Sequence, residues 1–230
     1  MHQHHHQKPN YSLETLRIAI DTQDEAILAA LTSRQRLVDR IRTAKAAEGH
    51  LVYRPGREAK ILRRLFAEAD PSLDRNLINQ MWREIFSSAI MLQEPLTVAV
   101  GTGSGFFLRE AARRDFGHAV TLETVSLDEA VEKLLSNELH IIVLPNTPEG
   151  VACVLRAIAA DDSIHIMGLM PFLSDGGEAR AYTIGRVCPE ESGDDITLYR
   201  DGDEIKMKDG FHLDVPGWLG VVPRPWVNRV

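Results

Sequence analysis

Residues 12–49, SLETLRIAIDTQDEAILAALTSRQRLVDRIRTAKAAEG, contain no proline and no glycine before Gly49. Apolar residues recur along this stretch at helical spacing, at Leu13, Leu16, Ile20, Ile27, Leu31, Leu37, Val38 and Ile41. The period predicts one helix of more than about 30 residues. Ser12 suits its N-cap, Glu14 suits its first turn and Gly49 ends it. The apolar stripe of so long a helix normally packs against another helix.

Two shorter helices are predicted after this one. Residues 53–56 (YRPG) read as a turn, residues 57–70 as a second helix that ends before Pro71, and residues 73–93 as a third helix. Ser72 or Asp74 would cap the third helix, and Pro95 would close it. Because so few helices surround each apolar stripe, we expect two chains to complete one core as an intertwined dimer.

The pattern changes after Pro95, where short β-rich runs alternate with helical runs. The expected strands and helices are 96–100, 106–117, 120–125, 126–137, 139–145, 151–160, 164–170, 179–187 and 195–202, with a glycine loop at 101–105. Residues 211–230 are too rich in proline and glycine to place. The alternation predicts a small parallel or mixed sheet. The expected fold is therefore multi-domain, with an all-α N-terminal half followed by an α/β C-terminal half.

Composition and charge support a division of the chain near residue 95. The 230 residues are 44% hydrophobic, enough for one large or two small globular cores. Residues 11–95 carry 13 Lys plus Arg against 12 Asp plus Glu, whereas residues 96–230 carry 12 against 21. We expect a helical domain at 11–95 and an α/β domain at 96–230, after a His-rich tail or tag at 1–10. An acidic second half argues against nucleic acid as a partner.

Neither a membrane nor a metal is expected as a partner. No stretch approaches the ~20 apolar residues that a membrane span needs, and the N-terminus lacks the apolar core of a signal peptide. The two cysteines, Cys153 and Cys188, fit neither a disulfide framework nor a thiol metal motif. These observations predict a cytoplasmic protein.

Two cations of the first predicted helix share one face. Arg34 and Lys45 are 11 positions apart, which at 100° per residue places them about 20° from each other. Arg17 lies 17 positions before Arg34, about 100° away around the axis. One straight helix would not aim all three at one ligand, but in an antiparallel dimer Arg17 could reach the partner's site. A lone cation on a helix is more often a solvated surface residue.

The helical half resembles the all-helical class of chorismate mutases over residues 13–94. The resemblance lies in the string LRIAIDTQDEAILAALTSRQRLVDRIRTAKAAEGHLVYRPGREAKIL and in IFSSAIMLQ of the third helix. The positions that match the family's site are Arg17, Arg34, Lys45, Arg57, Glu58 and Gln93. Two positions depart from the family: Arg54 stands where many members carry an aspartate, and Ala89 where some carry a serine.

The resemblance implies an activity without metal or cofactor. Chorismate, a dicarboxylate, would rearrange to prephenate by a pericyclic step in aromatic amino-acid biosynthesis, inside a pocket that orients it. It implies carboxylate binding by Arg17 from the neighbouring subunit, Arg34 and Arg57. It also implies that Lys45 and Gln93 donate hydrogen bonds to the ether oxygen of the substrate. Glu58 would accept from the ring hydroxyl. The implied catalytic residues are Arg34, Lys45, Glu58 and Gln93, and the implied substrate-binding residues are Arg17, Arg34, Lys45, Arg54, Arg57, Glu58, Ala89 and Gln93.

The C-terminal half looks like the first lobe of prephenate dehydratase. The similar segments are residues 97–117, residues 126–150 with Asn146 and Thr147, and residues 179–187. Only residues 151–178 stand where the family has a second lobe, and Ala179, Arg180 and Ala181 replace its Thr-Arg-Phe motif. We therefore expect a degenerate single lobe that serves as a structural or ligand-sensing appendage.

Three other readings stay open. The chain could be a bifunctional mutase–dehydratase, or a helical dimer without mutase activity that senses an aromatic amino acid. A lyase acting on isochorismate shares the helical fold and is the least favoured.

Within the second helix, Arg57 and Glu58 are expected to face the ligand, and Arg63 and Arg64 to face solvent.

Overall fold

The structure, a computed structural model, describes residues 11–45, 53–102, 106–174, 176 and 180–227. The chain forms two compact units, Met1–Gly49 and His50–Val230. The His-rich stretch 1–10 and the expected helix end at Gly49 lie outside the described residues.

The first unit is described by one helix, α1 (Leu13–Lys45). Its start confirms the predicted cap, because the Thr15 N–H donates to Ser12 Oγ at 3.1 Å. Apolar side chains at helical spacing are exposed along it: Leu13, Leu16, Ile20, Ile27, Leu31, Leu37 and Ile41. This row of exposed apolar side chains is what an unpartnered helix presents.

Two helices open the second unit, α2 (Pro55–Glu68) and α3 (Arg75–Gln93). The predicted turn at 53–56 is partly helical, because the ring of Pro55 suits the first position of a helix. Asp74, not Ser72, caps α3 by accepting from the Asn76 N–H at 2.9 Å. With three helices before the first strand, the predicted helical N-terminal part is confirmed.

A five-stranded mixed sheet forms the centre of the second unit, in the order β2-β1-β3-β6-β4. Its strands are β1 (Thr97–Thr102), β2 (Thr121–Ser126), β3 (Ile141–Pro145), β4 (His165–Met170) and β6 (Ala181–Gly185). β1 runs parallel to β2 and β3, whereas β6 is antiparallel to β3 and β4. The predicted α/β half with a mixed sheet is confirmed.

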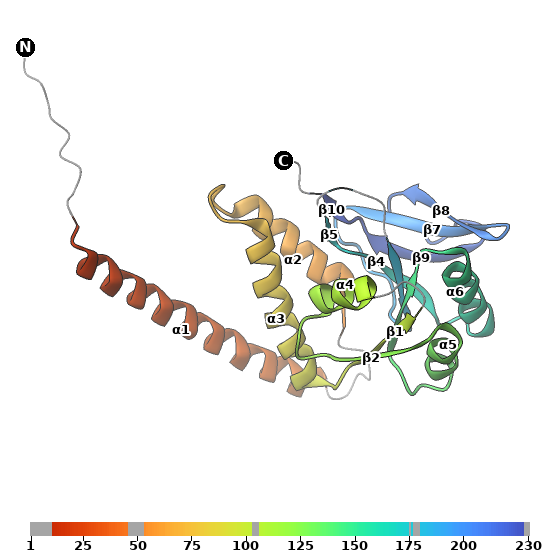
Figure 1. Ribbon diagram of the computed structural model, residues 1–230, viewed down its shortest axis with the longest axis horizontal. Helices are drawn as coiled ribbons and strands as arrows, with labels where there is room; N and C mark the ends of the chain where they lie inside the picture. Colours follow the sequence, from red (N-terminus) through yellow and green to blue (C-terminus); the bar gives the residue numbers. More distant parts are fainter. Residues whose placement is uncertain (1–10, 46–52, 103–105, 175, 177–179, 228–230) are drawn as a thin grey trace, which may run out of the picture. The chain divides into compact units, whose positions relative to one another are not determined.

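Helices cover both faces of this sheet (Figure 1). α5 (Leu127–Leu135) and α6 (Pro148–Ala160) lie on one face, in a core that contains Ile142 and Ile184. α4 (Phe106–Phe116) lies on the other face, over Val98 and Val143. The two cores exist because neighbouring strand residues point to opposite faces.

A second sheet is built by the last part of the chain. β7 (Asp195–Asp201) lies between β8 (Glu204–Asp209) and β9 (Trp218–Pro223), all antiparallel. Two short strands, β5 (Leu173–Ser174) and β10 (Trp226–Val227), pair in parallel. The stretch that the sequence left unplaced therefore supplies β9 and β10.

The helices α2 and α3 pack on this α/β part. Phe66 of α2 meets Trp226 edge-on with ring centroids 5.3 Å apart. Gly117 ends α4 with φ +74°, and a Cβ there would lie 2.5 Å from Ser87 Oγ on α3. Only glycine combines this backbone with so close an approach. α2 and α3 thus belong to the compact unit 50–230, and the domain boundary predicted at residue 95 stays a prediction.

Candidate functional site

The start of α2 is held by an acid from far along the chain. The Arg54 side chain makes no capping hydrogen bond to the helix. Instead, Glu190 accepts from the Arg57 backbone N–H through Oε1 at 2.8 Å, and its Oε2 accepts from the Arg54 guanidinium. A carboxylate at a helix N-terminus satisfies free N–H groups and complements the helix dipole. Arg54 and Glu190 therefore fix the first turn, while the Arg57 side chain is exposed.

Glu58 is buried within the second unit and paired with Arg83 of α3. Its side chain is turned into the protein, and the Arg83 guanidinium donates to Oε2 at 2.8 Å. Burial raises the pKa of Glu58 to about 7, because Arg83 only partly offsets the loss of solvent. Glu58 is thus a carboxyl whose charge changes near neutral pH.

A second buried acid lies close to the same arginine. Asp115 of α4 accepts from the Phe172 N–H at 2.9 Å, and burial raises its pKa above the ordinary value, against the lowering effect of Arg83. Burial also raises the pKa of Tyr53, and the charge on Glu58 raises it further. One buried guanidinium therefore faces two buried carboxyl groups, and we call Tyr53, Glu58, Arg83 and Asp115 the buried polar cluster.

The predicted residues of α3 lie one turn apart near its end. Ala89 is buried, and the Gln93 side-chain amide donates to the Ala89 carbonyl at 3.0 Å. In this arrangement the Gln93 amide nitrogen bonds to its own helix. The side chain is half-buried.

Arg17, Arg34 and Lys45 all belong to α1, in the first compact unit. Arg17 is exposed and lies 4.0 Å from Glu14, and Arg34 is half-buried. Lys45 is the last residue of the helix. The predicted site draws on both compact units, so its assembly stays a prediction.

One expectation for α2 is wrong. Arg63 does not face solvent: its guanidinium donates to the carbonyls of Ser192, Asp194 and Arg224 at 2.7–3.2 Å and to Ser192 Oγ at 2.7 Å. Carbonyls from two loops meet beside α2, and a five-donor guanidinium satisfies them together. Arg64 faces solvent as expected and pairs with Glu68.

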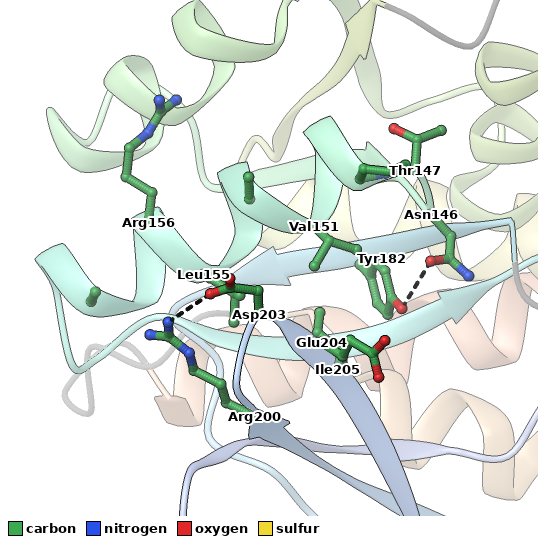
Figure 2. A pocket seen from close by; sticks show the side chains of 13 residues that line it. Asn146, Thr147, Val151, Leu155, Arg156, Tyr182, Arg200, Asp203, Glu204 and Ile205 are labelled. Carbon is green, nitrogen blue, oxygen red and sulfur yellow. Dashed lines mark hydrogen bonds and ion pairs between the residues drawn. The ribbon is translucent and has the colours of Figure 1, made fainter.

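The α/β part contains a cavity of about 860 Å³ between α6 and the β7–β8 turn (Figure 2). Asn146 and Thr147, which the sequence matched to the dehydratase lobe, line one end beside Tyr182. The Tyr182 hydroxyl donates to Asn146 Oδ1 at 3.1 Å. α6 lies against β3 because Gly150 has no side chain: a Cβ there would lie 2.0 Å from the Pro145 carbonyl oxygen.

The structure describes two of the three residues that replace the Thr-Arg-Phe motif. Arg180 lies over the Phe107 ring, with its Cζ 5.0 Å from the centroid, and Ala181 is buried in β6. Ala179 and loop residues 103–105 lie outside the described residues. Across the described ranges, no group of three His, Cys, Asp or Glu residues could hold a metal ion, and no helix is long and apolar enough to cross a membrane.

One family of known proteins matches the helical part of the chain. Residues 16–94 match the sequence profile of the family described as chorismate mutase type II. The N-terminal part of the chain carries a chorismate mutase type II domain. We call residues 16–94 the mutase segment.

The curated relatives that match part of the chain are longer proteins. The chain is 35% identical over 146 residues to the bifunctional chorismate mutase/prephenate dehydratase of Stutzerimonas stutzeri, covering 60% of this chain and 40% of that protein. The protein of the same name from Pseudomonas aeruginosa is 34% identical over 146 residues, with the same shares. The T-protein of Enterobacter agglomerans is 29% identical over 205 residues, 72% of this chain and 54% of that protein. The chain thus spans about 40% of the length of the first two relatives.

One solved structure covers the chain in part. It is described as "GqqA- a novel type of quorum quenching acylases" and covers 55% of this chain and 94% of its own, at 14% identity and a TM-score of 0.39. A likeness this weak carries no inference about the mutase segment or the α/β part.

Sequence reasoning missed Arg83, Asp115 and Glu190. Glu58 and Arg83 are 25 positions apart on different helices, and Glu190 lies 133 positions after Arg57. No local spacing connects such pairs. The only available signal was the lack of a capping side chain at Arg54, which left the N–H groups of α2 in need of a distant acceptor.

Proposed function

We propose that the chain catalyses the rearrangement of chorismate to prephenate in aromatic amino-acid biosynthesis. The family match over residues 16–94 carries this proposal. This mutase segment contains every residue that the resemblance assigns to the site: Arg17, Arg34, Lys45, Arg54, Arg57, Glu58, Ala89 and Gln93. The reaction needs no nucleophile, so orientation and electrostatics supply its catalysis.

In this proposal, arginine side chains hold the two carboxylates of the substrate. Arg17, Arg34 and Arg57 suit them because a guanidinium donates to both oxygens of a carboxylate. Arg57 is exposed and its backbone, not its side chain, is engaged by Glu190, so its guanidinium is available to an anion. Arg54 would have to release Glu190 before it could bind substrate, which makes it the weaker candidate.

Lys45 and Gln93 are proposed to donate to the ether oxygen, where negative charge builds as the C–O bond breaks. Gln93 would have to turn away from the Ala89 carbonyl to do so. Glu58 is proposed to accept from the ring hydroxyl through Oε1 while Arg83 holds Oε2. Arg83 would then act as a positioning residue for Glu58.

We propose a cytoplasmic homodimer in which Arg17 serves the partner's site. The exposed apolar stripe of α1 supports the dimer, because a second copy would bury it. The position of Arg17, about 100° around the helix from Arg34, supports the sharing.

A second candidate is a bifunctional mutase–dehydratase. The names of two relatives support it, and Asn146 and Thr147 line a cavity. The chain spans only about 40% of those proteins, and only residues 151–178 stand where the resemblance implies a second lobe. A non-catalytic sensor of an aromatic amino acid is the third candidate.

The rate of chorismate turnover in variants of α1 tests the proposed roles of Arg34 and Lys45. We expect Arg34→Ala and Lys45→Ala each to lower kcat/KM by about 100-fold or more, since each removes a donor to developing or bound charge. Arg36→Ala is the matched control, because Arg36 is exposed on α1 and lies about 200° around the helix from Arg34. Equal turnover by Arg34→Ala, Lys45→Ala and the control would overturn the site.

The product distinguishes the candidate functions. Prephenate alone as product supports the mutase, whereas phenylpyruvate formed from added prephenate at a comparable rate supports the bifunctional enzyme. A chain that turns over neither substrate but melts at a higher temperature with phenylalanine or tyrosine supports the sensor.

A further inference from the structure

The cavity beside α6 is not accounted for by the mutase proposal. It lies wholly within the compact unit 50–230, and none of the residues proposed for chorismate lines it. Its volume of about 860 Å³ is in the range of small-molecule sites. One wall comes from the β7–β8 turn, which follows the segments similar to the dehydratase lobe.

One edge of the apolar face of α6 borders the cavity. The centre of this face packs on the sheet through Val154 and Ala157, which are fully buried. Val151 and Leu155, at the edge of the same face, line the cavity together with Ala152. Figure 2 shows Val151 and Leu155 on α6 and Ile205 of β8 on the facing wall. These side chains give the cavity an apolar wall, which suits the apolar part of a small ligand.

The charged side chains around the cavity balance and are already paired. The lining contains two arginines, Arg156 and Arg200, and two acids, Asp203 and Glu204. Arg156 pairs with Asp128 at 2.5 Å and Arg200 with Asp203 at 3.4 Å, while Glu204 pairs with Lys206. The lining therefore offers no net attraction to a carboxylate ligand, and a dianion such as prephenate would not be favoured here.

The buried polar group of the cavity is the Tyr182 hydroxyl. Tyr182 is 3% exposed, and its hydroxyl donates to Asn146 Oδ1. A phenol oxygen that donates one hydrogen bond can still accept another. Thr147 Oγ caps α6 by accepting from the Gly150 N–H at 3.2 Å. The Tyr182 oxygen therefore suits a ligand hydroxyl, which can donate to it.

We propose that this cavity binds a small neutral molecule with a ring-sized apolar body against α6 and one hydroxyl group at Tyr182. The apolar body would contact Val151, Ala152, Leu155 and Ile205. The neutrality of the ligand follows from the paired charges, and its hydroxyl group follows from the Tyr182 oxygen, which can accept one more hydrogen bond. The α/β part is then a binding module of its own, whose ligand differs in charge from the substrate proposed for the mutase segment.

Three probes that share one benzene ring test the chemistry by calorimetric titration of the full chain near pH 7. They are p-cresol, toluene, which lacks the hydroxyl, and 4-hydroxyphenylacetate, which adds a carboxylate. We expect saturable binding of p-cresol. Toluene should bind about tenfold more weakly, because one hydrogen bond is lost, and 4-hydroxyphenylacetate should bind more weakly still. Tyr182→Phe should weaken p-cresol by about tenfold and leave toluene unchanged.

A matched pair of substitutions tests the location. Ala152 is exposed on α6 and lines the cavity, whereas Ala160 is exposed at the end of the same helix and does not line it. Ala152→Trp should place an indole ring against the apolar wall and abolish p-cresol binding, whereas Ala160→Trp should bind p-cresol as the unmodified chain does. The proposal fails if p-cresol does not bind saturably, if 4-hydroxyphenylacetate binds as tightly, or if Ala152→Trp leaves binding intact. Chorismate turnover of both variants should be unchanged, so this result is independent of the mutase assay.

Discussion

At the scale of single residues, the buried polar cluster combines one cation with two carboxyl groups. Arg83 pairs directly with Glu58, and Asp115 bonds to the Phe172 N–H instead. Two ionised carboxylates beside one guanidinium would leave a net negative charge away from water, which is costly. Proton uptake by Glu58 removes that charge. The protein should therefore be sensitive to pH through this cluster.

We predict that the free energy of unfolding falls as pH rises from about 4.5 to about 7. Glu58 has an ordinary pKa of 4.5 when unfolded and about 7 when folded, so the folded state binds more protons between these values. The stabilisation is full below pH 4.5, is lost as pH approaches 7, and amounts to at most about 3 kcal/mol. The raised pKa of Asp115 acts in the same direction at lower pH.

Urea unfolding at several pH values checks this prediction. Glu58→Gln should flatten the dependence of stability on pH between 4.5 and 7, because an amide does not titrate. Glu68→Gln is the control, since Glu68 lies on the same helix and is exposed, with 61% of its side chain accessible. An unchanged slope in Glu58→Gln would show that another group takes up the proton.

At the scale of elements, α2 is fastened to the end of the chain by two long-range polar contacts. Glu190 binds its first turn, and Arg63 binds carbonyls of Ser192, Asp194 and Arg224 one and a half turns later. The Arg63 and Arg83 guanidiniums also lie 5.8 and 5.4 Å from the Phe172 ring centroid. Through these cation–π contacts and hydrogen bonds, α2 and α3 pack against Phe172 and the ends of the second sheet.

We predict that Arg63→Ala lowers the free energy of unfolding by about 2–3 kcal/mol. The substitution leaves carbonyls from two loops without their charged donor, and hydrogen bonds to charged groups contribute about 1.5–3 kcal/mol. Arg64→Ala should change stability by less than about 0.5 kcal/mol, because its pair with Glu68 is exposed. Guanidinium chloride unfolding of both variants measures this difference. Equal free energies of unfolding for Arg63→Ala and Arg64→Ala would mean that solvent replaces the Arg63 contacts.

At the scale of the whole molecule, α1 shows a row of exposed apolar side chains that its own unit does not cover. An intertwined dimer would bury this row and bring Arg17 to a partner's site. The proposed activity would then depend on protein concentration, because the site would be incomplete in a monomer.

We predict that the double substitution Ile20→Glu and Ile27→Glu converts a dimer to a monomer and lowers mutase activity in parallel. Both residues lie on the exposed apolar row, and buried carboxylates would oppose association. Thr22→Glu adds a charge to an exposed position about 160° around the same helix from Ile20, away from that row, and should preserve the dimer. Light scattering coupled to chromatography measures the mass; an unmodified chain that is already monomeric would overturn the shared site.

Local sequence was sufficient to predict the helices and the strands of the central sheet, because their signals act over a few residues. Ser12, Asp74 and Ser126 cap helices as their side chains allow, and Gly117 ends α4 with a left-handed backbone. The change from helical to alternating spacing at residue 95 correctly marked the start of the sheet. The mutase residues were found by their family spacing, and their roles remain predictions.

The sequence alone thus determined the order of helices and strands from α1 to β4, the strands β6 and β7, most helix caps and the mutase segment, whereas β5, β8, β9 and β10 were not predicted. Only the tertiary structure decided that Arg63 turns inward, that Glu58 lies beside Arg83, that Glu190 caps α2 and that a cavity lies along α6. The physical reason is range. A helix period or a cap depends on neighbours within about four positions, whereas these contacts join residues 25 to 161 positions apart, whose meeting depends on how the elements pack.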